Sequence, residues 1–156
     1  MPLPPLLKLA SEAEYKQYFI DNYCNKCPII TFDGLPVMFY PDMFEHAFYK
    51  RTKPNWRAPK DSMDSNRCER LPWIKVVLTD RTIVPRQGYD KARRKYDNTR
   101  RIAFLAPNNY LVVIRNAGAK WRFVTAYLVD NQETANKILS SPVWEIQKPL
   151  VNRPSG

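Results

Sequence analysis

The hydrophobic period of the chain changes in its second half. Up to about residue 80, apolar residues recur mainly every three or four positions, a spacing typical of amphipathic helices. From residue 99 onward, apolar and polar residues alternate or form short β-branched runs, a pattern typical of strands. We therefore expect a mostly helical first half followed by a sheet.

Two helices are predicted in the first half. Residues 11–23 begin with Ser11 and carry Glu14 three positions later, which is the capping-box pattern. Residues 66–80 place apolar side chains at helical spacing, with Pro72 in the first turn, where its missing N–H costs nothing. Both helices have one apolar face to bury.

The segment between these helices is predicted to hold a β-hairpin and a short third helix. The hairpin covers residues 29–40 and turns at an Asp-Gly pair. Pro36 has no backbone donor, so we expect its strand at an edge. Asp42 then caps a helical turn carrying His46, the single histidine of the chain. Residues 50–66 are basic and proline-containing, and we expect a loop there.

Three β-type runs form the second half, at residues 100–106, 109–116 and 120–129. Links as short as these require antiparallel pairing. Residues 82–98 are expected to be a polar connection, and Gln132–Leu139 a last helix. The predicted fold class is α+β, with N-terminal helices packed on one face of a twisted antiparallel sheet of about four strands.

The length of 156 residues suits one domain. The net charge of +10 is uneven: residues 50–101 carry 16 Lys and Arg against 6 Asp and Glu, whereas residues 1–49 carry 3 against 6. A basic segment of this kind attracts polyanions, because phosphate contacts release condensed counterions. Nucleic acid is the leading predicted partner, and an anionic membrane or a merely solvated basic face are the alternatives.

Several classes of site lack their sequence signatures. The chain has no dinucleotide-binding, P-loop, zinc-protease or nucleophile-elbow motif. Cys24 and Cys27 form one CxxC pair without further ligands nearby, so we expect ordinary cysteines, no metal and no cofactor. No apolar run is long enough to span a bilayer, and the first residues make a poor signal peptide, so we expect no membrane partner and a cytoplasmic location.

One histidine, many arginines and lysines, and hydroxyl side chains on a sheet remain as candidate chemistry. Such a set is suited to cutting RNA without a metal ion. A base removes the proton of the 2′-hydroxyl, cations stabilise the phosphorane, and an acid protonates the departing 5′-oxygen. Imidazole titrates near neutrality and suits either proton transfer, while arginine offers two parallel donors to phosphate.

These motifs, taken together, resemble a known family. The segments "FEHAF", "RCERLPWI", "RRI", "NYLVVI", "RFVTAYLVD" and "SPVW", spread over residues 38–144, are similar to the phage- and mobile-element-associated branch of the barnase/EndoU/colicin/RelE-like (BECR) ribonuclease toxins. The resemblance implies an antiparallel sheet on N-terminal helices, and metal-independent transesterification of RNA on the exposed sheet face. For a toxin of this kind we also expect an acidic antitoxin or immunity protein as a partner.

The resemblance also implies where the site lies. It gives catalytic positions to His46 and Thr125, and strand alternation then directs Tyr127 and Phe123 to the same face as Thr125. The predicted catalytic set is His46, Thr125, Tyr127 and Arg70. The predicted RNA-binding set is Lys50, Arg51, Arg67, Arg100, Arg101 and Phe123. Of Arg100 and Arg101, alternation lets only one face the cleft.

Each of these residues has a structural alternative. A histidine between Phe44 and Phe48 suits a packed core, and Thr and Tyr are common in strands. Arg67 and Arg70 are also placed to pair with neighbouring carboxylates. Two other functions remain open: a non-catalytic RNA- or DNA-binding accessory protein of a phage or mobile element, and a protein-interaction factor with a basic face.

Overall fold

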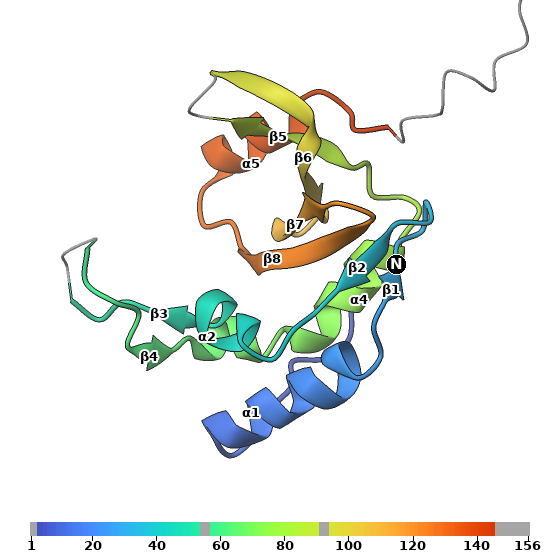
Figure 1. Cartoon of the computed structure of the whole chain (residues 1–156). Helices are drawn as coiled ribbons and strands as arrows, with labels where there is room; N and C mark the ends of the chain where they lie inside the picture. Colours follow the sequence, from blue (N-terminus) through green and yellow to red (C-terminus); the bar gives the residue numbers. More distant parts are fainter. Residues whose placement is uncertain (1–2, 54–56, 91–93, 146–156) are drawn as a thin grey trace, which may run out of the picture.

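The structure, a computed structural model, describes residues 3–53, 57–90 and 94–145. The chain is α+β, as expected, but its main sheet is mixed and has six strands, ordered β1-β2-β8-β7-β6-β5 (Figure 1). In chain order these strands are β1 (Ile29–Ile30), β2 (Pro36–Met38), β5 (Arg86–Asp90), β6 (Lys95–Leu105), β7 (Tyr110–Ala117) and β8 (Lys120–Leu128). The predicted sheet of about four antiparallel strands was therefore too small.

The predicted hairpin is confirmed, and it also joins the main sheet. Strand β2 pairs with β1 on one side and runs parallel to β8 on the other, with Val37 opposite Trp121. The prediction that Pro36 keeps this strand at an edge was wrong. Pro36 is the first residue of β2 and pairing with β8 begins one residue later, so its missing donor interrupts no ladder bond to β8.

The connection predicted for residues 82–98 is instead strand β5 and the beginning of β6. These two strands pair antiparallel, with an irregularity between Gln87 and Gly88. Gly88 lies against Arg101, and a Cβ atom at Gly88 would come within 2.7 Å of the Arg101 Cβ. The sequence concealed this strand because β5 is at the sheet edge, where charged residues replace an apolar alternation.

Six helical segments accompany the sheet within the described ranges. They are α1 (Glu12–Phe19), its π-helical continuation η1 (Ile20–Cys24), α2 (Met43–Ala47), α3 (Ser65–Cys68), α4 (Leu71–Thr79) and α5 (Gln132–Leu139). The helices predicted at residues 11–23 and 132–139 are confirmed. The helix predicted at residues 66–80 is divided at Arg70, since Asp64 caps α3 and Pro72 begins a new helix, α4.

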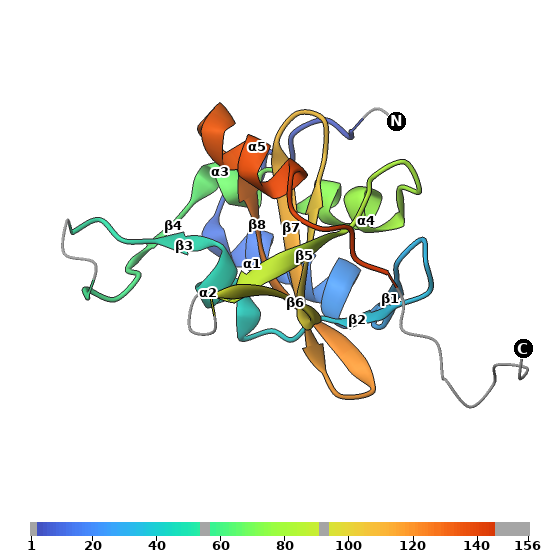
Figure 2. The same ribbon diagram turned by 90° about the horizontal axis from the view of Figure 1, so that it is seen from above.

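The segment predicted as a loop at residues 50–66 also contains some strand structure. Strand β3 (Tyr49–Lys50) pairs antiparallel with β4 (Ser62–Met63). This two-stranded ribbon projects away from the rest of the molecule in Figures 1 and 2. It carries basic residues outward rather than toward the core.

Helices lie on both faces of the sheet, not on one as predicted. We call the face toward α1, α2 and α4 the inner face; its core includes buried aromatic rings from α1, α2 and β8. Helix α5 packs on the opposite, outer face, over a smaller cluster that includes Leu105, Leu111 and Val129. Figures 1 and 2 show this helix separated from α1 by the sheet. The outer face beyond α5 carries no other helix of the described chain.

A β-bulge in β8 decides which of its side chains face outward. Val113 of β7 pairs with Thr125, but the next residue, Ile114, pairs with Phe123, so Val124 is an extra residue. One extra residue reverses the alternation on its two sides. Phe123 therefore points inward, only 3% exposed, with its ring centroid 5.0 Å from that of Phe39. The prediction that Phe123 lines the cleft was wrong.

None of the described helices is both long enough and apolar enough to cross a membrane.

Candidate nucleic-acid interface

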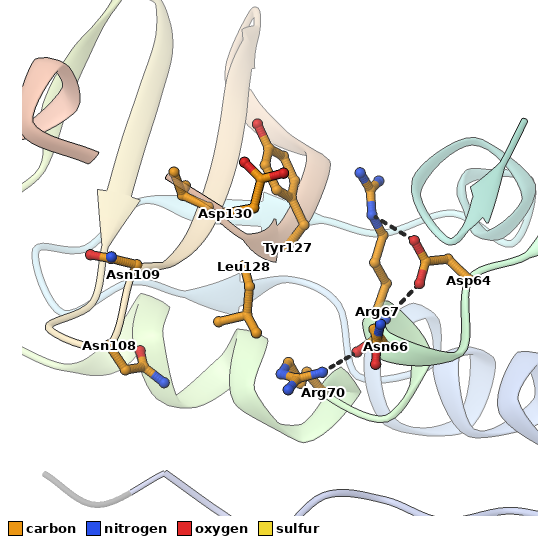
Figure 3. A pocket seen from close by; sticks show the side chains of 10 residues that line it. Asp64, Asn66, Arg67, Arg70, Asn108, Asn109, Tyr127, Leu128 and Asp130 are labelled. Atoms are coloured by element: carbon orange, nitrogen blue, oxygen red, sulfur yellow. Dashed lines mark hydrogen bonds and ion pairs between the residues drawn. The ribbon is translucent and has the colours of Figure 1, made fainter. Parts of the chain in front are cut away.

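A hollow of about 640 Å³ lies between α3 and the end of β8 (Figure 3). Its walls come from three parts of the chain: α3 and the residues around it, the β6–β7 turn, and the last residues of β8. The lining residues are Asp64, Asn66, Arg67, Arg70, Asn108, Asn109, Tyr127, Leu128, Val129 and Asp130. Three predicted site residues, Arg67, Arg70 and Tyr127, thus share one hollow.

Arg67 is held by contacts on several sides. Its Nη1 donates to the carbonyl oxygen of Ala47 at 3.0 Å, and its Nε lies 3.5 Å from a carboxylate oxygen of Asp64. Its guanidinium carbon is 4.7 Å from the ring centroid of Tyr127. A cation stacked on a ring and tied to a backbone carbonyl has a fixed orientation, which suits binding of an anion.

Arg70 forms another side of the hollow. Its Nη1 donates to the carbonyl oxygen of Asn66 at 2.7 Å, and its guanidinium lies over the Trp73 ring at 5.0 Å. Its Nε is buried and, among the described residues, has no hydrogen-bond partner. The predicted structural alternative is correct for the Arg67–Asp64 pair, whereas Glu69 pairs with Lys8 rather than with Arg70.

His46 lies at the end of α2, a helix that packs against β8, and its side chain is exposed. His46 does not line the hollow, but the next residue, Ala47, is hydrogen-bonded to Arg67, which does line it. Lys60 donates to the carbonyl oxygen of His46 at 2.6 Å, one residue before the carbonyl that Arg67 binds. Desolvation lowers the pKa of Lys60, and the charges of Arg67 and Arg51 lower it further. Cations therefore gather at the end of α2.

This cluster also has a structural role. The last carbonyl groups of a helix have no partner within the helix, and cations are favoured there. Lys60 and Arg67 satisfy two such carbonyl groups of α2, one at His46 and one at Ala47. Their hydrogen bonds to these carbonyl groups are thus explained by the fold alone.

Strand pairing arranges the outer face in three transverse rows across β6, β7 and β8. The row beneath α5 consists of Leu105, Leu111 and Tyr127. The middle row consists of Ala103, Val113 and Thr125. The third row, which we call the arginine row, consists of Arg101, Arg115 and Arg122. Thr125 and Tyr127 therefore face the same side of the sheet, and Thr125 separates Tyr127 from the arginine row.

The remaining predicted residues lie in different places. Arg101 belongs to the arginine row, Arg100 is its neighbour on β6, and neither of them lines the hollow beside Arg67. Lys50 and Arg51 are exposed at the β3–β4 ribbon, where Arg51 donates to the carbonyl oxygen of Ala58 at 2.7 Å. Neither of these two lines the hollow.

Sequence reasoning missed Arg115 and Arg122. Arg122 lies between the apolar residues Trp121 and Phe123, and Arg115 directly follows the apolar run that ends at Ile114, so their outward direction was readable from the sequence. Their alignment with Arg101 was not readable, because it depends on the register of three strands and on the bulge at Val124.

The cysteines do not form a reactive or metal-binding cluster in the part of the chain that the structure describes. Cys24, Cys27 and Cys68 are free thiols. Burial raises the pKa of Cys24 to about 11 and that of Cys68 to about 12, which keeps both protonated near neutrality. Residues 3–53, 57–90 and 94–145 contain no group of three His, Cys, Asp or Glu side chains suited to a metal ion.

No protein-family model, curated protein or solved structure matches this chain. The resemblance to BECR ribonuclease toxins accordingly stays a prediction.

Proposed function

We propose that this protein is a metal-independent endoribonuclease of the toxin type, with its reacting phosphate bound beside Arg67. The observation that carries the proposal is the position of Arg67. This side chain contacts the backbone carbonyl of Ala47, next to His46, and the ring of Tyr127, so it joins the two segments that carry these predicted catalytic residues.

In the proposed reaction, the 2′-hydroxyl of a ribose attacks the adjacent phosphorus. One proton leaves the 2′-oxygen, the bond from phosphorus to the 5′-oxygen breaks, and the 5′-oxygen takes up a proton. The products are a 2′,3′-cyclic phosphate and a 5′-hydroxyl, and no water or metal ion is consumed. His46 and Tyr127 are the assigned proton-transfer groups, while Thr125 orients the substrate.

Arg67 and Arg70 serve the charge that develops during this reaction. The phosphorane gains negative charge on its equatorial oxygens, and donors fixed in advance stabilise it without further reorganisation. Arg67 is fixed by Ala47, Asp64 and Tyr127. Arg70 adds a second guanidinium in the same hollow.

The test compares variants of the assigned proton-transfer groups in the presence of a chelator. We expect wild type to cut RNA, and His46→Ala and Tyr127→Phe each to lower kcat by about a hundredfold or more, because each removes a proton-transfer group. Tyr127→Phe keeps the ring beneath Arg67, so a loss of cleavage in this variant is due to the missing hydroxyl. Affinity for a 2′-O-methyl oligonucleotide, which lacks the attacking hydroxyl, should change little in either variant.

Arg81→Gln serves as the control, because Arg81 is exposed in the turn after α4 and lines neither the hollow nor the arginine row. We expect it to retain wild-type cleavage. Undiminished cleavage by His46→Ala would refute the role of that residue. If wild type binds RNA but does not cleave it, the proposal that this protein is an endoribonuclease is refuted.

The arginine row favours a second candidate, a non-catalytic RNA- or DNA-binding protein. Three aligned cations on an open sheet face suit phosphate binding whether or not chemistry follows. The same assay separates the two candidates: salt-dependent binding without any cleavage supports the second.

A further inference from the structure

The arginine row places three like charges directly opposite one another. Arg101 pairs with Arg115, and Arg115 with Arg122. Like charges at opposing positions of neighbouring strands repel and destabilise a sheet. Within the described residues, none of the three forms an ion pair with a carboxylate. The fold thus maintains an unfavourable charge arrangement that a bound anion would relieve.

Arg122 is oriented in advance for such a ligand. Its guanidinium carbon is 5.0 Å from the ring centroid of Tyr40, a side chain that is 37% exposed. Its Nε is buried and has no hydrogen-bond partner in the described part of the chain. A second hollow, of about 180 Å³, includes two residues of the row, and Arg100, Arg101, Arg115 and Asn116 line it.

Two similar pairs therefore mark the two ends of the outer face of β8. One is Arg122 with Tyr40, and the other is Arg67 with Tyr127. Arg122 lies opposite Arg115 and Tyr127 lies opposite Leu111, so the bulge at Val124 leaves four strand positions between the two pairs, which corresponds to about 13 Å. A single phosphate or nucleotide cannot contact both pairs, whereas a chain of linked phosphates can.

One row of the outer face lies between the two pairs. It is the middle row, made of Ala103, Val113 and Thr125, whose side chains are short and half-buried. A backbone can therefore lie along β8 from one pair to the other. The partly exposed ring of Tyr40 offers a stacking surface for an unpaired base, which a duplex would not present.

We infer that the arginine row and Tyr40 form a second subsite that binds the backbone and a base of single-stranded RNA, more than one nucleotide away from the phosphate held at Arg67. This inference rests on the proposed function for the identity of the reacting phosphate. It assigns the substrate class as single-stranded RNA longer than a dinucleotide. Arg115 and Arg122 are thereby assigned as binding residues.

The first test measures binding alone, with 2′-O-methyl RNA decamers and fluorescence anisotropy in chelator. Arg115→Gln combined with Arg122→Gln should weaken decamer binding about tenfold, because two charge-assisted contacts are lost. The slope of log affinity against log salt should become shallower by about 0.7 for each arginine removed. The double variant R115K/R122K keeps the charge without the planar fork, and we expect it to fall between wild type and the Gln variant.

The control is Arg81→Gln, which removes one charge of the same kind and should leave decamer affinity near that of wild type. Thermal melting of each variant confirms that the fold persists. Equal decamer affinity in the double Gln variant and the control would overturn the inference. So would equally tight, equally row-dependent binding of a blunt RNA duplex of the same length.

The second test uses cleavable substrates and separates this inference from the proposed function. The preference for a decamer over a dinucleotide, expressed as a ratio of kcat/KM values, should fall about tenfold in the double Gln variant. Cleavage with an unchanged ratio would overturn the inference of a second subsite and would still agree with the proposed ribonuclease activity. Binding that depends on the arginine row, without any cleavage, would overturn the proposed ribonuclease activity and support the arginine row as a binding surface.

Discussion

At the scale of single residues, Arg67 has more than one task. Its contacts with Ala47 and Asp64 are explained by the local fold, because they satisfy the end of α2 and the cap region of α3. Its position over Tyr127 is not required for either purpose. A residue that the fold holds rigidly is well suited to bind a developing charge, since it needs no reorganisation.

The arginine row predicts a conflict between stability and binding at Arg115. This residue has an arginine on either side, so Arg115→Gln removes two repulsive pairs. We expect the free energy of unfolding of the RNA-free protein to rise by about 0.5 kcal/mol. The gain should shrink in high salt, where the repulsion is screened.

Urea denaturation at low and high salt measures this effect, with Arg81→Gln as the matched loss of charge. A variant that is destabilised to the same extent at both salt concentrations would show that Arg115 contributes packing rather than repulsion. Stabilisation without any weakening of RNA binding would contradict the assignment of the row to a ligand.

At the scale of helices and strands, the sequence was sufficient to predict those elements that local signals specify. The cap at Ser11, the short turns of the meander and the Asp-Gly hairpin turn are local signals, and the elements they predict are present. The parallel pairing of β2 with β8 joins residues more than 80 positions apart, and no local pattern specifies it. The bulge at Val124 was equally hidden, since Phe123 and Val124 are both apolar and suit either alternation.

These limits explain which site residues were predicted. Tyr127 was placed correctly because it follows Thr125 by two residues after the bulge, where alternation holds. Phe123 was misplaced because it precedes the bulge. Arg67 and Arg70 reach the same hollow although their helix is divided, because the break at Arg70 keeps both side chains beside β8.

The connection between η1 and α4 gives a prediction for this scale. The buried hydroxyl of Tyr23 donates to the carbonyl oxygen of Leu71 and accepts from the backbone N–H of Lys75 at 3.2 Å. Tyr23→Phe removes this link, and we expect a loss of about 1 kcal/mol in the free energy of unfolding at pH 7.

The same variant should behave differently at alkaline pH. Burial raises the pKa of Tyr23 well above its usual value, so the folded protein keeps this phenol neutral. The contribution of the Tyr23 hydroxyl to the free energy of unfolding is fully present below about pH 10. It is lost as pH rises further, because the phenol ionises at lower pH in the unfolded chain than in the folded protein. The free energy of unfolding of wild type exceeds that of Tyr23→Phe at pH 7, and this difference, measured by urea denaturation, should therefore narrow between pH 9 and pH 11. A difference that is constant or grows over this range would contradict the burial of this hydroxyl.

At the scale of the whole molecule, the two faces of the sheet have different compositions. The inner face and its helices hold the large aromatic core, and α1, η1 and α2 carry the acidic residues Glu12, Glu14, Asp21 and Glu45. The outer face holds α5 at one end and cations at the other. This division leaves a basic surface open without weakening the main core.

The central claim is that this surface cleaves RNA by transesterification. The most direct measurement is the chemistry of the fragment ends after incubation of purified wild-type protein with single-stranded RNA in chelator, read by mass spectrometry. We predict fragments that end in 2′,3′-cyclic phosphate and begin with a 5′-hydroxyl. Intact RNA, or fragments with 3′-hydroxyl and 5′-phosphate ends, would contradict the account.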